Sequence, residues 1–276
     1  MTISSAESTA SSADNPVEGI WNFRDVGGAD SPVTIRPGVL FRSSELSGLT
    51  PAGAQTLRGL GVTDLYDLRS PTEIARTGSD RVDGGIRVHE VPFATPAAGE
   101  ERAPHEIAYR QMMLASMTAG RGPDPASQVE FMLAEYRRFP ELPGTLVALR
   151  TVADQLSSGA TALVHCAAGK DRTGLLVGLV LSSVGIGYAD IAADYLRSNA
   201  AIGAMRAHIS AQMEAAEPEL AQTMATMLSD EVLGVREEYL ETGFREVANL
   251  FGSPEAMLNA AGVDAEGLAA LRSALT

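Results

Sequence analysis

The sequence predicts a single α/β domain with a central, mainly parallel sheet flanked by helices. Short apolar segments rich in β-favouring residues alternate with amphipathic segments that carry helix start signals, and this alternation is typical of parallel sheets. Near residue 166 an apolar strand runs through a short loop into an apolar helix. That arrangement aims backbone N–H groups and a helix N-terminus at an anion. The 276 residues, 45% of them hydrophobic, suffice for a full core.

Four segments are predicted to be strands, because they are apolar and bounded by Gly, Pro, Ser or Asp. They are 39–41, 64–68, 86–93 and 162–166. The first two helices have clear start signals. Thr50 followed by Pro51 begins a helix that ends near Gly61, and Ser70 with Glu73 forms a capping box for the next.

After residue 125 the pattern is mostly helical. The predicted helices cover 126–139, 145–158, 175–184, 190–197 and 202–228, followed by two short helices on either side of Gly262. Residues 94–125 are rich in proline, and their apolar residues recur with helical spacing only at 106–117. We therefore expect this segment to be a long connection that leaves the sheet, an excursion between two elements. Residues 1–17, rich in Ser, Ala and acidic residues, are expected to be disordered, which leaves 18–276 as the folded domain.

The composition excludes several classes of function. The formal net charge is −14, so most of the surface repels a polyanion and nucleic-acid binding is not expected. One cysteine cannot form an intramolecular disulfide or a multi-cysteine zinc site, and the histidines lack metal-ligand spacing. We therefore expect no metal and no cofactor. The N-terminus lacks a signal-peptide pattern and no apolar segment is long enough to span a membrane, so the sequence predicts a soluble protein.

The strongest chemical signal is the segment 161–174, TALVHCAAGKDRTG. Cys166 stands at the end of a predicted strand, Arg172 follows six positions later, and Thr173 enters the next helix. A loop this short can wrap a phosphate with successive backbone N–H groups while the arginine closes the far side with two hydrogen bonds. The predicted phosphate-binding residues are Ala167, Ala168, Gly169, Lys170, Arg172 and Thr173.

The same electropositive loop would stabilise a thiolate at Cys166. A free cysteine titrates near 8.5, and helix N-termini and nearby cations lower that pKa to roughly 3.5–7.5. The thiolate would attack phosphorus and form a thiophosphate intermediate, which water then hydrolyses. The Thr173 hydroxyl could stabilise the sulfur when it leaves again as a thiolate.

Other interpretations of this loop were weighed against catalysis. A lone cysteine is by default a buried strand residue, but the complete pattern with Arg172 argues against that reading. A nucleotide-binding P-loop needs Gly where Val164 stands and Ser or Thr where Asp171 stands. A sulfur transferase, whose loop also uses a strand-end cysteine, and a phosphate-binding adaptor with weak or no turnover stay open as alternatives.

The segment HCAAGKDRTG resembles the HCxxGxxR[ST] signature of the protein tyrosine phosphatase superfamily. Four further segments are similar to the atypical bacterial tyrosine and phosphoinositide phosphatases: NFRDVGG at 22–28, FRSSEL at 41–46, DLRS at 67–70 and DYLRSN at 194–199. The resemblance covers roughly residues 20–275. It implies a phosphatase-like α/β fold and activity on phosphotyrosine together with phosphoserine, phosphothreonine and phosphoinositides.

Carried over residue by residue, the resemblance makes Cys166 the nucleophile and Arg172 the phosphate-binding arginine. It matches Lys170 to a lysine of related lipid phosphatases, whose ammonium could reach a second phosphate on an inositol ring; the alternative is a merely solvated lysine. His165 is expected to hydrogen-bond the loop backbone and so to support the site without touching substrate.

The general acid is less clearly marked. The family usually supplies an aspartate from a separate loop, yet the corresponding segment 91–104 contains none. Asp171 is therefore our candidate acid, because related lipid phosphatases with an aspartate at this place are thought to use it in catalysis. Its structural alternative is a salt bridge that orients Lys170 or Arg172.

The segment 202–228 is predicted to form two helices that meet near Pro218, each with apolar residues along one face. Core packing is the ordinary explanation of such faces. Methionine, however, recurs on surfaces that repack, and the resembling family has a helical pair over its site. We therefore expect a mobile lid that excludes water and oxidant from Cys166. The expected partner is a phosphorylated protein or a phosphoinositide; the expected location is the cytoplasm, with signal-less secretion as the alternative.

Overall fold

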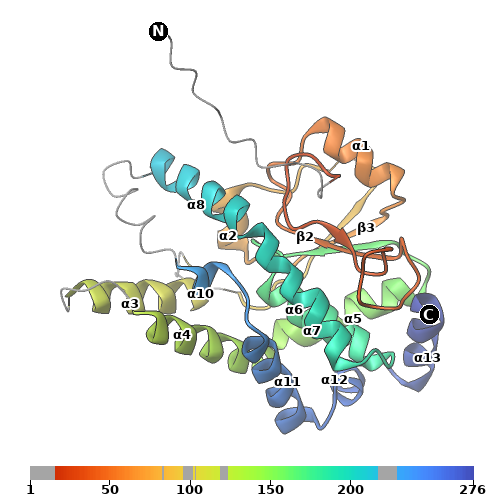
Figure 1. Ribbon diagram of the computed structural model, residues 1–276. Coiled ribbons are helices and arrows are strands. Elements are labelled where there is room, and N and C mark those ends of the chain that lie inside the picture. The colour runs from red at the N-terminus through yellow and green to blue at the C-terminus, as the bar shows by residue number, and fades with distance from the viewer. Residues whose placement is uncertain (1–15, 83, 96–101, 103, 119–123, 217–228) are drawn as a thin grey trace.

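The computed structural model describes residues 16–82, 84–95, 102, 104–118, 124–216 and 229–276. A five-stranded sheet lies at the centre with helices packed on both of its faces (Figure 1). The strands are β1 Arg24–Asp25, β2 Leu40–Ser43, β3 Asp64–Asp67, β4 Arg87–Glu90 and β5 Ala162–His165. The helices are α1 Pro51–Gly59, α2 Pro71–Thr77, α3 Pro104–Thr118, α4 Pro125–Arg138, α5 Pro143–Ser157, α6 Asp171–Ser183, α7 Tyr188–Leu196, α8 Ile202–Ala216, α10 Asp230–Leu233, α11 Glu237–Phe251, α12 Pro254–Ala260 and α13 Ala265–Leu275.

The sheet has the order β1-β2-β5-β3-β4. Only β1 is antiparallel to its neighbour, so the prediction of a mainly parallel sheet is confirmed. Register pairs His165 at the end of β5 with Ser43 of β2 on one side and with Asp67 of β3 on the other. Ligands of open α/β sheets bind beyond the carboxyl ends of the strands. The residues after His165 therefore enter the middle of that edge.

The sheet separates two hydrophobic cores, and β5 contributes to both. Ala162 and Val164 face the larger core, which also contains residues of α4, α5, α6 and α11. Leu163 faces the smaller core, together with Leu57 of α1. Successive side chains of a strand point to opposite faces, so a four-residue apolar strand such as β5 belongs at the centre of a sheet covered on both sides.

The four predicted strands are confirmed within a few residues as β2, β3, β4 and β5. Three elements were not predicted: β1, α11 and the four-residue helix α10. β1 is two residues long and gives no periodic signal. Helix α11 has a strong apolar face, but its N-cap residue Arg236 makes no side-chain capping bond, so the start signal is absent. The helix predicted from residue 175 begins earlier, at Asp171, because the end of the loop already forms its first turn.

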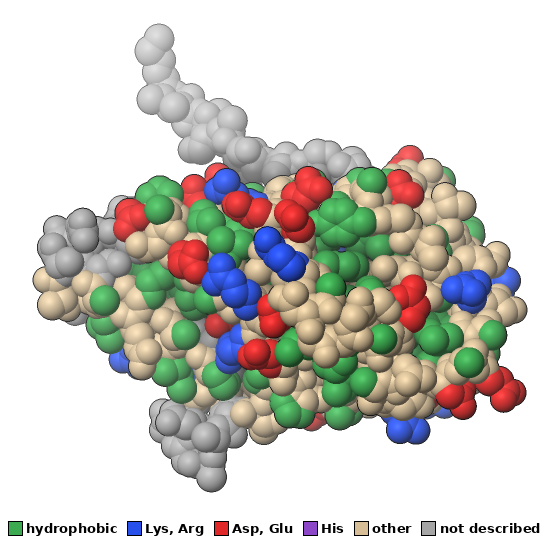
Figure 2. Space-filling model, turned by 90° about the horizontal axis from the view of Figure 1, so that it is seen from below, with side chains coloured by type: hydrophobic (Ala, Val, Ile, Leu, Met, Phe, Trp, Pro, Cys, Tyr) green, Lys and Arg blue, Asp and Glu red, His purple; other side chains and the backbone are tan. Residues whose placement is uncertain are grey.

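Three sequence predictions fall partly outside the described residues, among them the excursion 94–125, of which 96–101, 103 and 119–123 are not described. Of the segment 1–17, residues 1–15 are not described, whereas Val17 is buried in the smaller core and so belongs to the folded domain. Of the segment 202–228, only 202–216 is described, as α8. Within the described residues, no helix combines the length and the apolarity needed to span a bilayer. The face in Figure 2 shows acidic and basic side chains interspersed among hydrophobic ones, without an extended basic strip.

Candidate active site

The candidate site is the loop of residues 166–170 between β5 and α6. Gly169 in this loop has a φ of +66°, and a Cβ on it would lie 1.9 Å from the backbone oxygen of Ser43. Side chains disfavour that φ and no space exists for one, so the position requires glycine. The loop can therefore lie directly against the end of β2.

Cys166 is the first residue of the loop and only 2% of it is exposed. Burial raises the pKa of its thiol, but the positive charge of Arg172 and the Thr173 hydroxyl lower it more, so the net shift is downward. Thr173 Oγ1 is itself buried and has no nitrogen or oxygen partner among the described residues. That leaves the hydroxyl for the sulfur. The surroundings thus bias Cys166 toward the thiolate.

Arg172, in the first turn of α6, is held by Glu73 of α2. Its Nη1 donates to Glu73 Oε2 at 2.8 Å and its Nη2 to Oε1 at 2.7 Å, and Nη1 also donates to the Leu68 backbone oxygen at 3.2 Å. Glu73 accepts a further hydrogen bond from the backbone N of Ser70, which completes the predicted capping box. The carboxylate that starts α2 therefore also orients Arg172. The sequence predicts only the capping role, because the partner lies 99 residues away.

The pairing with Glu73 leaves one edge of the Arg172 guanidinium available. Within the described part of the chain, its Nε–H and one Nη2–H make no hydrogen bond. These two N–H groups lie on the same edge and match two oxygens of a phosphate. Arg172 is thus held in a geometry that can clamp an oxyanion.

Lys170 is placed differently from its predicted role. It is 6% exposed, and its Nζ donates to the backbone oxygens of Val232 at 2.6 Å and Gly234 at 3.0 Å. The ammonium also lies 3.1 Å from Asp171 Oδ2. It is therefore not merely solvated: it binds the end of α10, and a second phosphate would have to replace those carbonyls.

Asp171 is the first residue of α6, and 21% of its side chain is exposed. The salt bridge to Lys170 that was its structural alternative is present. In addition, the buried Tyr136 hydroxyl donates to Asp171 Oδ1 at 3.0 Å and lies 2.6 Å from the hydroxyl of Tyr195. Tyr136 had no sequence signal, and Tyr195 lies in the segment DYLRSN without having been assigned a role. The carboxylates of the segment 91–104, where the family usually carries its acid, are Glu100 and Glu101, and both lie outside the described residues.

His165 lies beneath the loop, as predicted: its Nδ1 is 3.2 Å from the Cys166 backbone oxygen, and its Nε2 is 3.0 Å from Asp80 Oδ2. Burial lowers the pKa of His165, but Asp67 and Asp80 raise it more. The side chains of His165, Asp67 and Asp80 are close enough together to hold a metal ion. Arg69, however, donates to both carboxylates and offsets one of their two negative charges, so the cluster already has a cationic partner.

Two further helices contact the loop: α8 and α10, which we call the front cover. A small apolar cluster joins the front cover to the loop residue Ala168. Its members are Trp21, Ala168, Ile202, Met205, Ile209 and Leu233. The described part of the predicted lid therefore packs over the candidate site.

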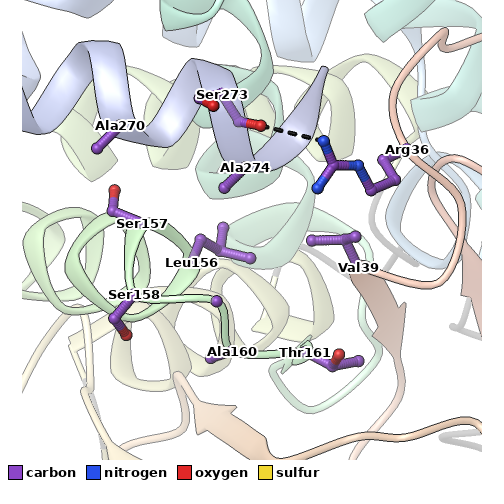
Figure 3. Close-up of a pocket in the computed structure, with 11 residues that line it drawn as sticks. Arg36, Val39, Leu156, Ser157, Ser158, Ala160, Thr161, Ala270, Ser273 and Ala274 are labelled. Carbon is purple, nitrogen blue, oxygen red and sulfur yellow. Dashed lines mark hydrogen bonds between the residues drawn. The ribbon is translucent and has the colours of Figure 1, made fainter.

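A separate groove of about 460 Å³ lies at the opposite end of β5, between the segment 156–161 and α13 (Figure 3). Arg36 reaches across it and donates to the Ser273 backbone oxygen at 3.2 Å. The groove contacts the residues that precede β5, whereas Cys166 follows β5. It is therefore no part of the candidate site.

Comparison with known proteins gives this geometry a context. The family model described as the tyrosine phosphatase family matches residues 15–276. The chain is 43% identical over 269 residues to the triple specificity protein phosphatase PtpB of Mycobacterium tuberculosis, covering 93% of this chain and 97% of that protein. It is 32% identical over 238 residues to a Cupriavidus necator protein named as a candidate tyrosine-protein phosphatase, covering 85% and 78%. With its expected α/β sheet in place and a match of nearly full length, the chain belongs to the tyrosine phosphatase family.

Proposed function

We propose that the chain hydrolyses phosphate monoesters with Cys166 as nucleophile and the loop 166–173 as phosphate site. The thiolate sulfur attacks phosphorus, and the bond to the leaving oxygen breaks as the sulfur–phosphorus bond forms. Water then attacks phosphorus, releasing inorganic phosphate and restoring the thiolate. The observation that carries this proposal is geometric: the buried Cys166 follows β5 directly, and Arg172, held by Glu73, stands in the first turn of α6 at the end of the same loop.

Arg172 is proposed to clamp two phosphate oxygens through its free edge. Its bonds to Glu73 pre-orient the guanidinium, so little ordering remains when substrate binds. The backbone N–H groups of the loop, including those of Ala167, Ala168 and Gly169, supply the remaining donors. Thr173 is proposed to stabilise the sulfur as it leaves.

Asp171 is proposed as the general acid. It would protonate the leaving oxygen in the first step and accept a proton from the attacking water in the second. Two observations support it: the side chain begins α6 beside the loop, and the Tyr136 hydroxyl holds one carboxylate oxygen in place.

The proposed substrates are phosphotyrosine, with phosphoserine, phosphothreonine and phosphoinositides in addition. The name of the 43% identical mycobacterial relative supports this breadth. Lys170 is proposed to contact a second phosphate of an inositol ring once the end of α10 releases its ammonium. A cytoplasmic location, with signal-less secretion as the alternative, stays a prediction.

The test compares wild type, Cys166→Ser and Asp171→Asn on a phosphotyrosine peptide, a phosphoserine peptide and soluble phosphoinositides across pH. We expect Cys166→Ser to lose turnover by about four orders of magnitude or more, as removal of a nucleophile does. Asp171→Asn should lose most on the alkyl phosphates, whose leaving oxygens most need a proton. Undiminished turnover by Cys166→Ser would refute the proposed nucleophile. Full activity of Asp171→Asn on alkyl phosphates would assign the acid to another residue.

A further inference from the structure

The outer side of the phosphate loop contacts a cluster of polar side chains that the proposed chemistry does not use. Asn22 precedes β1, Arg24 lies in β1, Arg42 in β2 and Asp194 in α7. We call these four residues the outer cluster. They come from three distant segments of the sequence, and Arg24, Arg42 and Asp194 are each less than 9% exposed.

The outer cluster binds three successive carbonyls of the loop. Asn22 Nδ2 donates to the backbone oxygens of Ala168 and Gly169, both at 3.0 Å. Arg42 Nη2 donates to those of Gly169 at 2.9 Å and Lys170 at 3.3 Å. In a trans peptide the C=O and the next N–H point in opposite directions. Carbonyls held outward therefore turn the following N–H groups toward the inside of the loop, where an anion would bind.

Ion pairs hold the two donors in place. Asp194 accepts from Arg24 Nε at 2.8 Å and from Arg42 Nη1 at 2.9 Å. Arg24 Nη1 in turn donates to Asn22 Oδ1 at 2.7 Å, which orients the Asn22 amide so that its nitrogen faces the loop. Asn22 has a φ of +55°, a left-handed conformation that asparagine tolerates better than most residues. Each member is thus needed to place the next.

The outer cluster, together with the neighbouring Arg197, carries surplus positive charge. Arg24, Arg42 and Arg197 surround the one carboxylate of Asp194, with Arg197 Nη1 at 3.8 Å from it. Burial, and then the charge of Arg42, lower the pKa of Arg24 to about 10, which still leaves it protonated at neutral pH. Three guanidinium groups thus face one carboxylate.

Inside the loop the cations are already balanced. Arg172 is paired with Glu73, and Lys170 with Asp171. On the outer side, by contrast, the described residues place three guanidinium groups around one carboxylate, so positive charge remains unbalanced there, in a chain whose formal net charge is −14.

We propose that Asn22 and Arg42 are positioning residues of the phosphate loop, fixed by Arg24 and Asp194, and that the outer cluster supplies unbalanced positive charge for anions bound inside. The proposal rests on the proposed function, because it requires the loop to bind phosphate. None of the four residues is assigned a contact with substrate. Their effect passes through the direction of the backbone N–H groups and through the local field.

The experiment measures Cys166 directly and needs no turnover. Iodoacetamide alkylates the single cysteine, and added inorganic phosphate protects it in proportion to occupancy of the loop. The readouts are the phosphate concentration for half-protection, the pH midpoint of alkylation, and the cooperative thermal transition that shows each variant to be folded. Asn22→Gly removes the amide but permits the positive φ. Arg42→Lys keeps the positive charge and removes the planar guanidinium with its fixed set of N–H donors.

We expect Asn22→Gly and Arg42→Lys each to raise the half-protecting phosphate concentration about tenfold. The first variant loses an amide nitrogen that binds two loop carbonyls, and the second loses a charge-assisted hydrogen bond. The pH midpoint should stay near wild type in Arg42→Lys. Arg197→Gln is the matched control for charge, since no loop carbonyl accepts from Arg197 among the described contacts; it should raise the pH midpoint slightly and leave protection within about twofold.

The outcomes separate this proposal from the proposed function. If folded Asn22→Gly and Arg42→Lys are protected by the same phosphate concentration as wild type, the positioning role is wrong and the outer cluster is purely structural. If Arg197→Gln weakens protection as much as they do, charge alone explains the effect and positioning is again wrong. If phosphate fails to protect wild type at all, the loop is not a phosphate site and the proposed function itself fails.

Discussion

The two sides of the phosphate loop are held by different forces. On the outer side, Asn22 and Arg42 donate hydrogen bonds to the loop carbonyls, and a buried carboxylate, Asp194, ties the arginines together. On the other side the front cover contacts the loop through the apolar side chains of Met205 and Leu233 and through the bonds of Lys170 to backbone carbonyls.

This difference indicates which side can move. Removing a partner from a buried charged pair leaves a charge without compensation, which costs roughly 3–5 kcal/mol. Separating a small apolar cluster costs only the area that it buries, and a lysine that loses carbonyl acceptors can bind water or phosphate instead. We infer that the outer cluster holds its side of the loop rigidly, whereas the front cover can move away from the loop. The predictions below test the two sides in turn.

The largest effect is expected at Glu73, which holds Arg172 from helix α2. Glu73→Gln keeps the shape and an acceptor for the cap of α2 but cannot accept from both nitrogens of the guanidinium. We expect kcat on a phosphotyrosine peptide to fall about 10- to 100-fold, because a misplaced clamp loses orientation, and stability to fall by about 3 kcal/mol. Steady-state kinetics and urea unfolding measure the two effects. Glu90→Gln, at an exposed position on the same edge, is the control; equal kcat in both variants would show that Arg172 needs no such support.

The next effect concerns Lys170, the only lysine of the chain. Lys170→Met should lower turnover of a soluble phosphoinositide about tenfold more than turnover of a phosphotyrosine peptide, since only the former offers a second phosphate. Arg206→Met is the matched control, because it breaks the 2.6 Å ion pair between α8 and Asp230 of the front cover. If both variants change the two substrates alike, Lys170 serves only to hold the front cover.

A smaller effect is expected from the front cover itself. Met205→Ala should speed iodoacetamide alkylation of Cys166 a few-fold, because a gap in the apolar cluster loosens α8 over the loop. Met132→Ala in α4 removes a similarly buried methionine from the large core. It should cost comparable stability without faster alkylation. Equal rates in Met205→Ala and wild type would remove the support for α8 as a lid.

The smallest effect is a change in the stability contribution of Asp194 at acidic pH. Burial by itself raises the pKa of Asp194, but Arg24 and Arg42 lower it more, so the folded pKa lies below the unfolded value near 3.9. This stabilisation is present above the unfolded pKa and is lost as pH falls through the folded pKa. Asp194→Asn should therefore be less stable than wild type at pH 7, and the difference should shrink by on the order of 1 kcal/mol at pH 3. Urea unfolding at the two pH values measures it; a constant difference would mean that the carboxylate charge is not what stabilises the cluster.

Much of the fold could be predicted because the signals are local. The capping box of Ser70 and Glu73, the Pro51 helix start and the apolar strand before Cys166 each lie within a few residues, and all are present in the structure. Helix α11 was missed for the same reason, since Arg236 provides no capping signal and its apolar face shows only against α4 and α6.

The candidate site likewise has a part that local sequence marks and a part that depends on distant residues. The spacing of Cys166, Arg172 and Thr173 marks the loop without any structure, because one short loop carries all three groups. The partners of that loop are not local. Nothing in the sequence near Glu73 shows that it faces Arg172, and the buried acceptors of Lys170 at Val232 and Gly234 are more than 60 residues away.

The sequence by itself determined the parallel α/β sheet, the strand–loop–helix around Cys166 and the tyrosine phosphatase family, because periodicity, caps and a contiguous motif are written over short stretches of chain. Only the tertiary structure decided what surrounds the loop: Asn22 and Arg42 on its carbonyls, Glu73 on its arginine and α10 on its lysine. Each of these contacts joins residues on separate elements, and the sheet register and helix packing that bring them together depend on the whole core.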